Sequence, residues 1–394
     1  MSQHTVTAAP PPERTPAVVP DRGKAPLGRL VGVDLARGLA VFGMYAAHVG
    51  PDPDRGGGTG LLMELAHGRA SALFALLAGF AVVLITGRRA PKTGRAGRQA
   101  VAKVIIRAVI LLALGTALTL TDTPVQVILA FYGLYFLLVL PLYRLGAGQL
   151  ALIAAGGALV CPQVLYALER VFGDEVLRIP GEPAGLASLL FTGLISLLFA
   201  GTYPALTWLP LVVAGMAIAR LDLAAAGVRI RLALTGAALA LAGHGGSWLA
   251  LRLFFGAATP AWWSDTADFP SAGTPGWLLV ASPHSETTLS ILGNAGVAIM
   301  VLGACLAAMD ALPRLRRLAG PVIAVGSMSL TAYVFHIVGI QLLGIEELPG
   351  SPLPVLLGFI ASVTVFAAVW SRFFRRGPLE WLMSKATGTA RHVR

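Results

Sequence analysis

Charged residues are scarce in this chain, and so are cysteines. Asp, Glu, Lys and Arg together make up 12% of the 394 residues, against 56% hydrophobic residues, and the mean hydropathy is +0.75. That composition excludes an ordinary soluble globular domain. Cys161 and Cys305 are the only cysteines and lie far apart in apolar runs, which excludes a disulfide framework and a paired-cysteine metal site.

The sequence consists instead of repeated apolar runs of about 20 residues, the length that a helix needs to cross a bilayer. We predict an all-α, polytopic helical membrane protein, because a helix satisfies its own backbone hydrogen bonds in lipid. A further apolar run, Leu186 to Ala200, is predicted to be an interfacial or re-entrant helix, since too few residues follow for two crossings. The ten predicted spans are residues 30–49, 67–87, 102–120, 125–143, 148–167, 202–219, 231–254, 287–309, 320–344 and 354–373.

Basic residues predict the orientation of these spans. Most of the Lys and Arg residues fall in the N-terminal tail and in alternate loops, which the spans place on one side of the membrane. The positive-inside rule makes this side the cytoplasm, so both termini are predicted to be cytoplasmic. The net charge of +11 then needs no nucleic acid, because topology and anionic lipid headgroups explain it. The same basic rim can also attract an anionic cytosolic ligand such as a nucleotide-bearing cofactor.

The chain divides into three parts. Residues 1–27 are polar and Pro-rich and have no apolar core of a signal peptide, so we predict a disordered cytoplasmic tail. Residues 28–376 hold all the spans and form one membrane domain, and residues 377–394 are predicted to be a basic cytoplasmic tail. The predicted location is the plasma membrane, which is the inner membrane in a bacterium.

The first predicted span carries three ionisable residues, Asp34, Arg37 and His48. Each charged group at the centre of a span costs about 2.5–3.5 kcal/mol, so such groups are rare and usually functional. Asp34 and Arg37 are three residues apart and therefore lie on one helix face, where they can partly neutralise each other. The alternative is a charge pair near the membrane edge that only fixes the helix.

Five histidines map to the outer half of the membrane or to outer loops in this topology: His48, His67, His244, His284 and His336. One interpretation is a polar cavity that opens outward, in which an imidazole acts as general base. The alternative is an interhelical hydrogen bond, which we favour for His244 and His336. A metal site is disfavoured because no HxxxH or HExxH spacing is present.

Two segments carry a family resemblance. The pattern R-x4-D-x2-R-G-x-A, which stands as Arg29, Asp34, Arg37, Gly38 and Ala40, resembles the opening motif of integral-membrane acyltransferases. The segment HGRASALFALLAG, starting at His67, resembles the second span of the heparan-alpha-glucosaminide N-acetyltransferase catalytic domain. His48 matches the related bacterial surface-polysaccharide O-acyltransferases. Residues 203–221, 326–336 and 375–388 extend the likeness, and the last two resemble a related bacterial multi-span family with a C-terminal GPLEW signature.

The resemblance implies an enzyme that moves an acyl group, such as acetyl, from cytosolic acyl-CoA to an extracytoplasmic hydroxyl or amine on a sugar or glycoconjugate. His67 is the acyl-handling residue that it implies. The candidate catalytic residues are His67, His48 and Asp34. The candidate donor-binding residues are Arg37, Arg88, Arg107, Arg316 and Arg317. No metal is expected.

Two other functions remain open. A small-molecule transporter or exporter would use Asp34, His48, His244 and His336 as an intramembrane proton relay. A non-catalytic membrane protein on the same fold is the other alternative, because the span after His67 has no aspartate, unlike that of the acetyltransferase. The arrangement of cavities relative to the basic side distinguishes among the three.

Overall fold

A computed structural model describes residues 30–88, 90–178, 186–255, 274–346 and 348–394. Helices account for the regular structure throughout, and the described residues contain no β-strand, which confirms the all-α prediction. The predicted disordered tail, 1–27, lies outside the described residues.

The first part of the chain forms eight α-helices, several of which coincide with predicted spans. They are α1 Val31–Val49, α2 Gly57–Ala66, α3 Arg69–Thr86, α4 Gly94–Thr119, α5 Ile128–Val139, α6 Ala147–Arg178, α7 Leu186–Phe199 and α8 Ala205–Arg220. The apolar run that was predicted to be interfacial or re-entrant is the helix α7. Its position relative to a bilayer stays a prediction.

The second part forms α9 Ala226–Ala240, α10 Gly246–Phe255, α11 Thr288–Ala311, α12 Pro313–Leu318, α13 Gly320–Ser327, α14 Ser329–Leu342, α15 Leu353–Phe373 and α16 Pro378–Gly388. A π-helical turn, Leu241–Gly245, joins α9 to α10. Six helical segments of the described chain are long and apolar enough to cross a membrane, and a seventh is added if α13 and α14 count as one span. The chain is therefore a helical protein with several candidate spans, and the prediction of ten stays a prediction.

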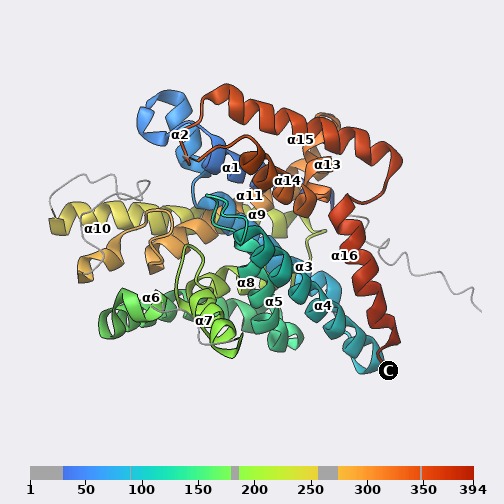
Figure 1. Ribbon diagram of the computed structural model, residues 1–394, viewed down its shortest axis with the longest axis horizontal. Helices are drawn as coiled ribbons and strands as arrows, with labels where there is room; N and C mark the ends of the chain where they lie inside the picture. The colour runs from blue at the N-terminus through green and yellow to red at the C-terminus, as the bar shows by residue number, and fades with distance from the viewer. Residues whose placement is uncertain (1–29, 89, 179–185, 256–273, 347) are drawn as a thin grey trace, which may run out of the picture. The chain divides into compact units, whose positions relative to one another are not determined.

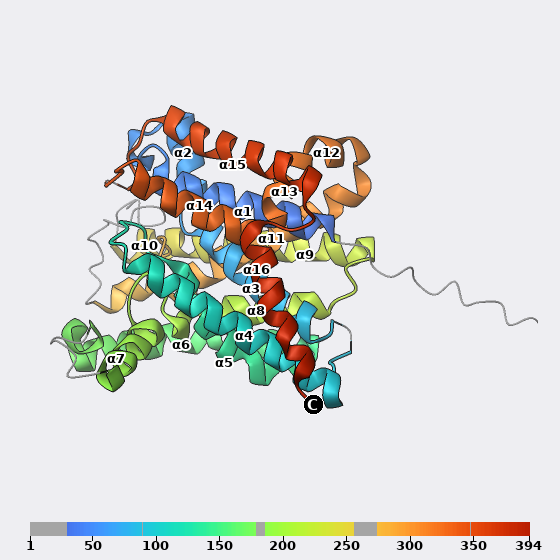
Figure 2. The ribbon, with the colours of Figure 1, turned by 45° about the vertical axis from the view of Figure 1, so that its right-hand side comes forward.

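The helices α3 and α8 lie in the middle of the bundle. Figures 1 and 2 show α1, α13, α14 and α15 grouped on one side of α3, and α6 with α7 on the other side of α8. The α3–α8 crossing depends on two glycines, because a Cβ at Gly79 would collide with the Val212 carbonyl and one at Gly215 with the Leu76 carbonyl. Small residues of this kind let helix backbones approach closely in a membrane protein.

The predicted span 320–344 is not a continuous helix. α13 and α14 meet at Met328 with a bend of 86°. The break exposes the first N–H groups of α14, which need new partners. Glu380 of α16 accepts hydrogen bonds from the Leu330 and Thr331 backbone N–H groups, at 2.8 and 3.1 Å, and one from Thr331 Oγ1 at 2.6 Å. The segment 377–394 thus forms a helix that stabilises the break and packs against α4.

Candidate functional site

A cavity of about 410 Å³ lies among α1, α3, α4, α5, α14 and α16, and we call it the basic cavity. Three arginines line it: Arg37 from α1, Arg107 from α4, and Arg376 from the turn before α16. The other polar residues of its lining are Tyr132, Ser327, Ser329, Tyr333, Glu380, Ser384 and Thr387. Two of the predicted donor-binding residues, Arg37 and Arg107, therefore meet in one cavity.

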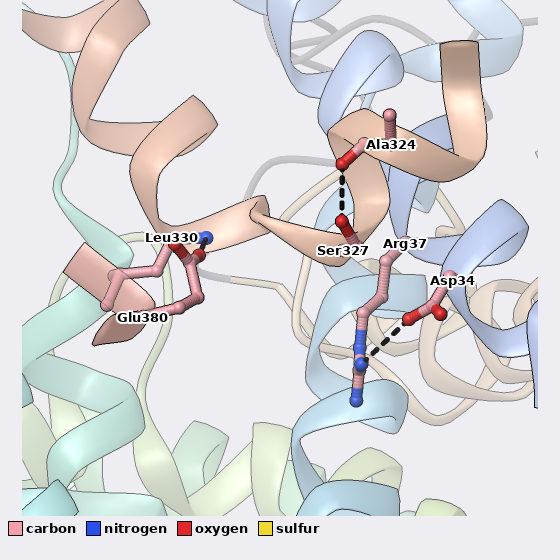
Figure 3. A network of polar contacts seen from close by, with 6 residues as sticks. All are labelled: Asp34, Arg37, Ala324, Ser327, Leu330 and Glu380. Carbon is pink, nitrogen blue, oxygen red and sulfur yellow. Dashed lines mark hydrogen bonds and ion pairs between the residues drawn. The ribbon is translucent and has the colours of Figure 1, made fainter. Parts of the chain in front are cut away.

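The predicted Asp34–Arg37 ion pair is confirmed. Arg37 Nη1 lies 3.4 Å from Asp34 Oδ1, one helical turn earlier on α1 (Figure 3). The Asp34 side chain is only 8% exposed and is not among the described residues that line the basic cavity. The geometry makes Asp34 a residue that positions the guanidinium of Arg37, whereas Arg37 itself faces the cavity.

The basic cavity has a net positive lining. Glu380 is the one carboxylate among its described lining residues, and three hydrogen bonds hold that carboxylate at the start of α14. Figure 3 shows Glu380 reaching the backbone at Leu330, away from the Asp34–Arg37 pair. Three guanidinium groups then face a space whose walls also include Phe74, Leu77 and Leu84. Such a lining favours an anionic ligand with an apolar portion.

Tyr333 connects the basic cavity to a pair of histidines. Tyr333 lines the cavity, and its ring lies 5.0 Å from the His336 ring in an edge-on contact. His336 Nε2 in turn lies 2.9 Å from His48 Nδ1, so a hydrogen bond joins α14 to α1. This bond confirms the interhelical role that the sequence predicts for His336. His336 is fully buried, and Tyr45 packs against its ring at 4.7 Å.

His67 lies at the turn between α2 and α3. Arg69 stabilises this turn by donating hydrogen bonds to the backbone carbonyls of Glu64 and His67, at 2.6 and 3.3 Å. His67 and His284 are close enough to His48 to interact with it electrostatically. The described lining of the basic cavity does not include His67. The structure therefore places His67 and His284 near the His48–His336 pair, with His67 outside the basic cavity.

The other predicted residues lie elsewhere. Arg88 donates to the carbonyls of Ala219 and Leu221, at 3.1 and 3.3 Å, and so holds the end of α8. Arg316 and Arg317 lie on α12 with exposed side chains, outside the lining of the basic cavity. Neither ring nitrogen of His244 has a hydrogen-bond partner among the described residues, so the interhelical bond predicted for it is not found there.

A second cavity, of about 640 Å³, lies among α6, α7, the start of α8 and the loop before α11. We call it the His284 cavity. His284 and Glu286 line it, together with Gln126, Tyr166, Glu169 and Trp277. His284 appears in the sequence analysis only as one outer histidine, and Glu286 had no predicted role. Their only signal was the polar run Ser282–Thr287 before an apolar span.

Sequence reasoning also missed Arg376. Arg376 lies at the end of the predicted membrane domain, 28–376, and the sequence analysis assigns it no role in a site. The contact between α16 and the break in the α13–α14 span brings Arg376 to the cavity, and a pairing over that sequence distance leaves no local pattern. Among the described residues, no group of three or more His, Cys, Asp or Glu side chains could hold a metal ion.

The helices and the basic cavity together indicate the class of protein to which the chain belongs. Several long apolar helices and a cation-lined cavity within the bundle characterise a multi-pass helical membrane protein. Residues 29–251, more than half of the chain, match the model of the heparan-alpha-glucosaminide N-acetyltransferase catalytic domain. The chain belongs to that family and is an acyltransferase-like membrane protein.

A second match covers the C-terminal part. Residues 242–390 match a family described as a protein of unknown function, DUF418. A comparison with curated protein sequences gave no match. The acetyltransferase match includes Arg37, His48, His67 and Arg107. His284, Glu286 and Arg376 lie within the DUF418 match. Both cavities therefore draw on residues outside the acetyltransferase match.

Proposed function

We propose that this protein transfers an acyl group, such as acetyl, from cytosolic acyl-CoA to a hydroxyl or amine on an extracytoplasmic sugar or glycoconjugate. The observation that carries the proposal is that the basic cavity lies beside a hydrogen-bonded pair of histidines. Tyr333 lines the cavity that holds three arginines, and its ring contacts His336 of the hydrogen-bonded His48–His336 pair. The proposed donor site and the proposed general base would then be neighbours.

The basic cavity suits the donor. Arg37, Arg107 and Arg376 would bind the phosphates of acyl-CoA, because guanidinium groups pair with phosphate through charge-assisted hydrogen bonds. Phe74 and Leu77 offer an apolar wall for the pantetheine arm and the acyl group. Asp34 would act indirectly by orienting Arg37. Arg88, Arg316 and Arg317, which lie outside this lining, would contribute charge to the basic rim.

The transfer step needs one base. The acceptor oxygen or nitrogen attacks the thioester carbonyl, a new C–O or C–N bond forms, and the C–S bond to CoA breaks. The acceptor proton passes to a histidine, which returns it to the leaving thiolate. His48 is suited to this role because His336 holds its ring through Nδ1, and Nε2 carries the reactive lone pair in the tautomer in which Nδ1 donates to His336. His67 stays a candidate for the same step, or for carrying the acyl group covalently.

A proton-coupled transporter is the second candidate. The 86° break between α13 and α14 favours it, because discontinuous helices often form the substrate sites of transporters. The buried His48–His336 pair could serve as a proton relay in that case. A transporter would move its substrate unchanged, so chemical modification of the acceptor separates the two candidates.

The test is a transfer assay with radiolabelled acetyl-CoA and the purified full-length protein. Arg107→Gln and Arg376→Gln should each raise the KM for acetyl-CoA about tenfold, since each removes one phosphate contact worth about 1.4 kcal/mol. The matched control is Arg314→Gln, an exposed arginine on α12 outside the cavity lining. If His67 takes the proton or carries the acyl group, His67→Ala should abolish transfer and leave membrane insertion unchanged. Transfer at the wild-type rate in that variant would remove His67 from the mechanism.

A further inference from the structure

The loop before α11 holds two side chains against the start of α8. Glu286 Oε1 accepts a hydrogen bond of 2.9 Å from Trp208 Nε1, and Glu286 Oε2 accepts one from Thr207 Oγ1. A carboxylate oxygen has two lone pairs, so each oxygen can accept one further bond. Since Glu286 lines the His284 cavity, a ligand there can donate to a carboxylate whose position is already fixed.

His284 is fixed from two directions. Its Nδ1 lies 3.0 Å from the Thr202 carbonyl oxygen, so this nitrogen carries the proton and donates. Nε2 then carries the lone pair of the neutral ring and can accept a hydrogen bond. The ring also stacks on Trp208 at 5.8 Å and meets the edge of Tyr203 at 5.2 Å. His284 therefore presents an acceptor in a defined tautomer and orientation.

The loop adopts an uncommon backbone conformation to present these groups. His284 and Glu286 both have positive φ angles, 56° and 57°, which non-glycine residues rarely adopt. Hydrogen bonds from Trp277 Nε1 to the Ser285 carbonyl and from Ser290 Oγ to the Ser282 carbonyl stabilise the turn. Such backbone conformations persist where the surrounding contacts hold them, and they cluster at ligand sites.

The composition of the His284 cavity indicates the class of its ligand. Aromatic rings of Tyr166, Phe199 and Trp277 line it beside the acceptors Gln126, Glu169, His284 and Glu286. None of the described lining residues is a lysine or arginine. Aromatic faces pack against the C–H faces of a sugar ring, and carboxylate and amide oxygens accept from its hydroxyl groups. Glu169 and Glu286 are negatively charged when ionised, and with no lysine or arginine among the described lining residues they disfavour an acidic ligand.

We propose that the His284 cavity is a binding site for a saccharide that carries hydroxyl or ammonium groups and no acid group, with His284 and Glu286 as its acceptors. This inference rests on the proposed function where it identifies that saccharide as the acyl acceptor. It assigns the acceptor to the part of the chain that matches DUF418, outside the acetyltransferase match. The basic cavity and the His284 cavity would then hold the donor and the acceptor separately.

The test is saccharide binding to the purified full-length protein without acyl-CoA, measured by equilibrium dialysis with radiolabelled glucosamine, glucose and glucuronate. Glucosamine and glucose should bind, and glucuronate should bind at least about tenfold more weakly. Equal binding of glucuronate and glucosamine, or no binding of any of the three, would overturn the proposal. This comparison uses the wild-type protein, so it does not depend on the folding of a variant.

Two variants test the acceptors. Glu286→Gln keeps the shape of the side chain and should weaken glucosamine binding about tenfold. His284→Asn tolerates the positive φ, retains an amide donor for the Thr202 carbonyl and removes the Nε2 acceptor, so it should weaken binding about fivefold. Glu346→Gln is the matched control, since Glu346 is exposed and outside the cavity lining. Unchanged binding in both cavity variants would contradict the proposal.

The outcome also separates this inference from the proposed function. Saccharide binding without acyl transfer would support the site and refute the acyltransferase. Acyl transfer in a protein whose His284 and Glu286 variants keep full affinity and rate would support the acyltransferase and refute this acceptor site.

Discussion

At the residue scale, the His48–His336 contact has a chemical consequence. Two neutral imidazoles joined by one hydrogen bond must adopt complementary tautomers, since one nitrogen donates and the other accepts. If His48 Nδ1 donates to His336 Nε2, the reactive nitrogen of His48 is Nε2. His336 thus positions the base, and its own ring contacts Tyr333, which lines the basic cavity.

His336→Ala should lower the kcat of acyl transfer about 10²-fold with little change in the KM for acetyl-CoA, because the base loses its orientation and the donor site does not. His336→Gln should restore part of the rate, since its amide oxygen can accept from His48 near the position of Nε2. Steady-state kinetics and the pH profile of kcat measure both effects. A rate in His336→Ala equal to that of the wild type would show that the pair only packs two helices.

The Glu286 carboxyl should make the free energy of unfolding depend on pH. Burial raises the pKa of its carboxyl from 4.5 to about 7, against hydrogen bonds from Thr207 and Trp208 that lower it and the charge of Glu169, which raises it further. Tyr135, Tyr166 and His284 are further titratable groups near this carboxyl. The folded protein then binds a proton that the unfolded chain releases, so the free energy of unfolding falls as pH rises from about 4.5 to about 7.

The expected loss is about 1–2 kcal/mol, given the part exposure of the side chain. Thermal unfolding in detergent at pH 5 and pH 8 measures it, and Glu286→Gln should reduce the difference between the two midpoints. The Glu346→Gln variant should keep the wild-type difference. An unchanged pH dependence in Glu286→Gln would assign the effect to other groups.

At the scale of elements, α16 acts as a brace for the broken α13–α14 span. Glu380 supplies the acceptor that the first N–H groups of α14 require, and Leu379 N–H donates to Thr331 Oγ1 at 3.1 Å. Glu380→Ala should therefore destabilise the protein by about 2 kcal/mol, because it removes a helix cap and leaves buried donors without partners. Thermal unfolding of that variant beside Glu346→Gln checks the value. Equal stability of the two variants would mean that α14 needs no cap.

The α3–α8 crossing gives a second test at this scale. Gly79→Ala and Gly215→Ala should each lower the unfolding midpoint strongly, because each added methyl group collides with a carbonyl of the facing helix. Gly156→Ala and Gly358→Ala are matched controls, since a Cβ at either helical position has no atom of the protein within 4 Å. The controls should be neutral or slightly stabilising, as alanine is the better helix former. Similar midpoints in all four variants would contradict the close crossing.

The local sequence pattern predicted the helices better than it predicted the contacts between them. The helical fold and the Asp34–Arg37 pair follow from apolar run length and from three-residue spacing, and both are confirmed. The break between α13 and α14 at Met328 was not predictable, because the residues on both sides of it have the composition of one continuous apolar span. Its compensating group, Glu380, lies 49 residues from Thr331, and no local pattern encodes a contact at that separation.

The candidate site was predictable in part for the same reason. Depth along the spans grouped the outer histidines, and the structure joins His48 to His336 across 288 residues. Arg37 and Arg107 face the basic cavity, whereas Arg88 binds carbonyls at the end of α8. The charge of these residues is the same, so it could not predict that difference. Which way a side chain points depends on helix packing, and packing is a property of the folded bundle.

At the scale of the whole molecule, the proposed mechanism carries only an acyl group through the bundle, and neither the donor nor the acceptor crosses it. The donor would stay in the basic cavity and the acceptor in the His284 cavity, so neither would cross the membrane. A transporter would instead require one site that opens to each side in turn. The position of product relative to donor therefore distinguishes the two functions.

The most direct measurement uses the full-length protein in sealed proteoliposomes, with radiolabelled acetyl-CoA outside and glucosamine enclosed. We expect labelled acetylated sugar inside the vesicles, at a rate that falls in Arg107→Gln and in His336→Ala. Its controls are protein-free vesicles and the Arg314→Gln variant, which should match the wild type. Labelled sugar that forms only when donor and acceptor share one compartment, or unmodified glucosamine that leaves the vesicles without label, would contradict the account.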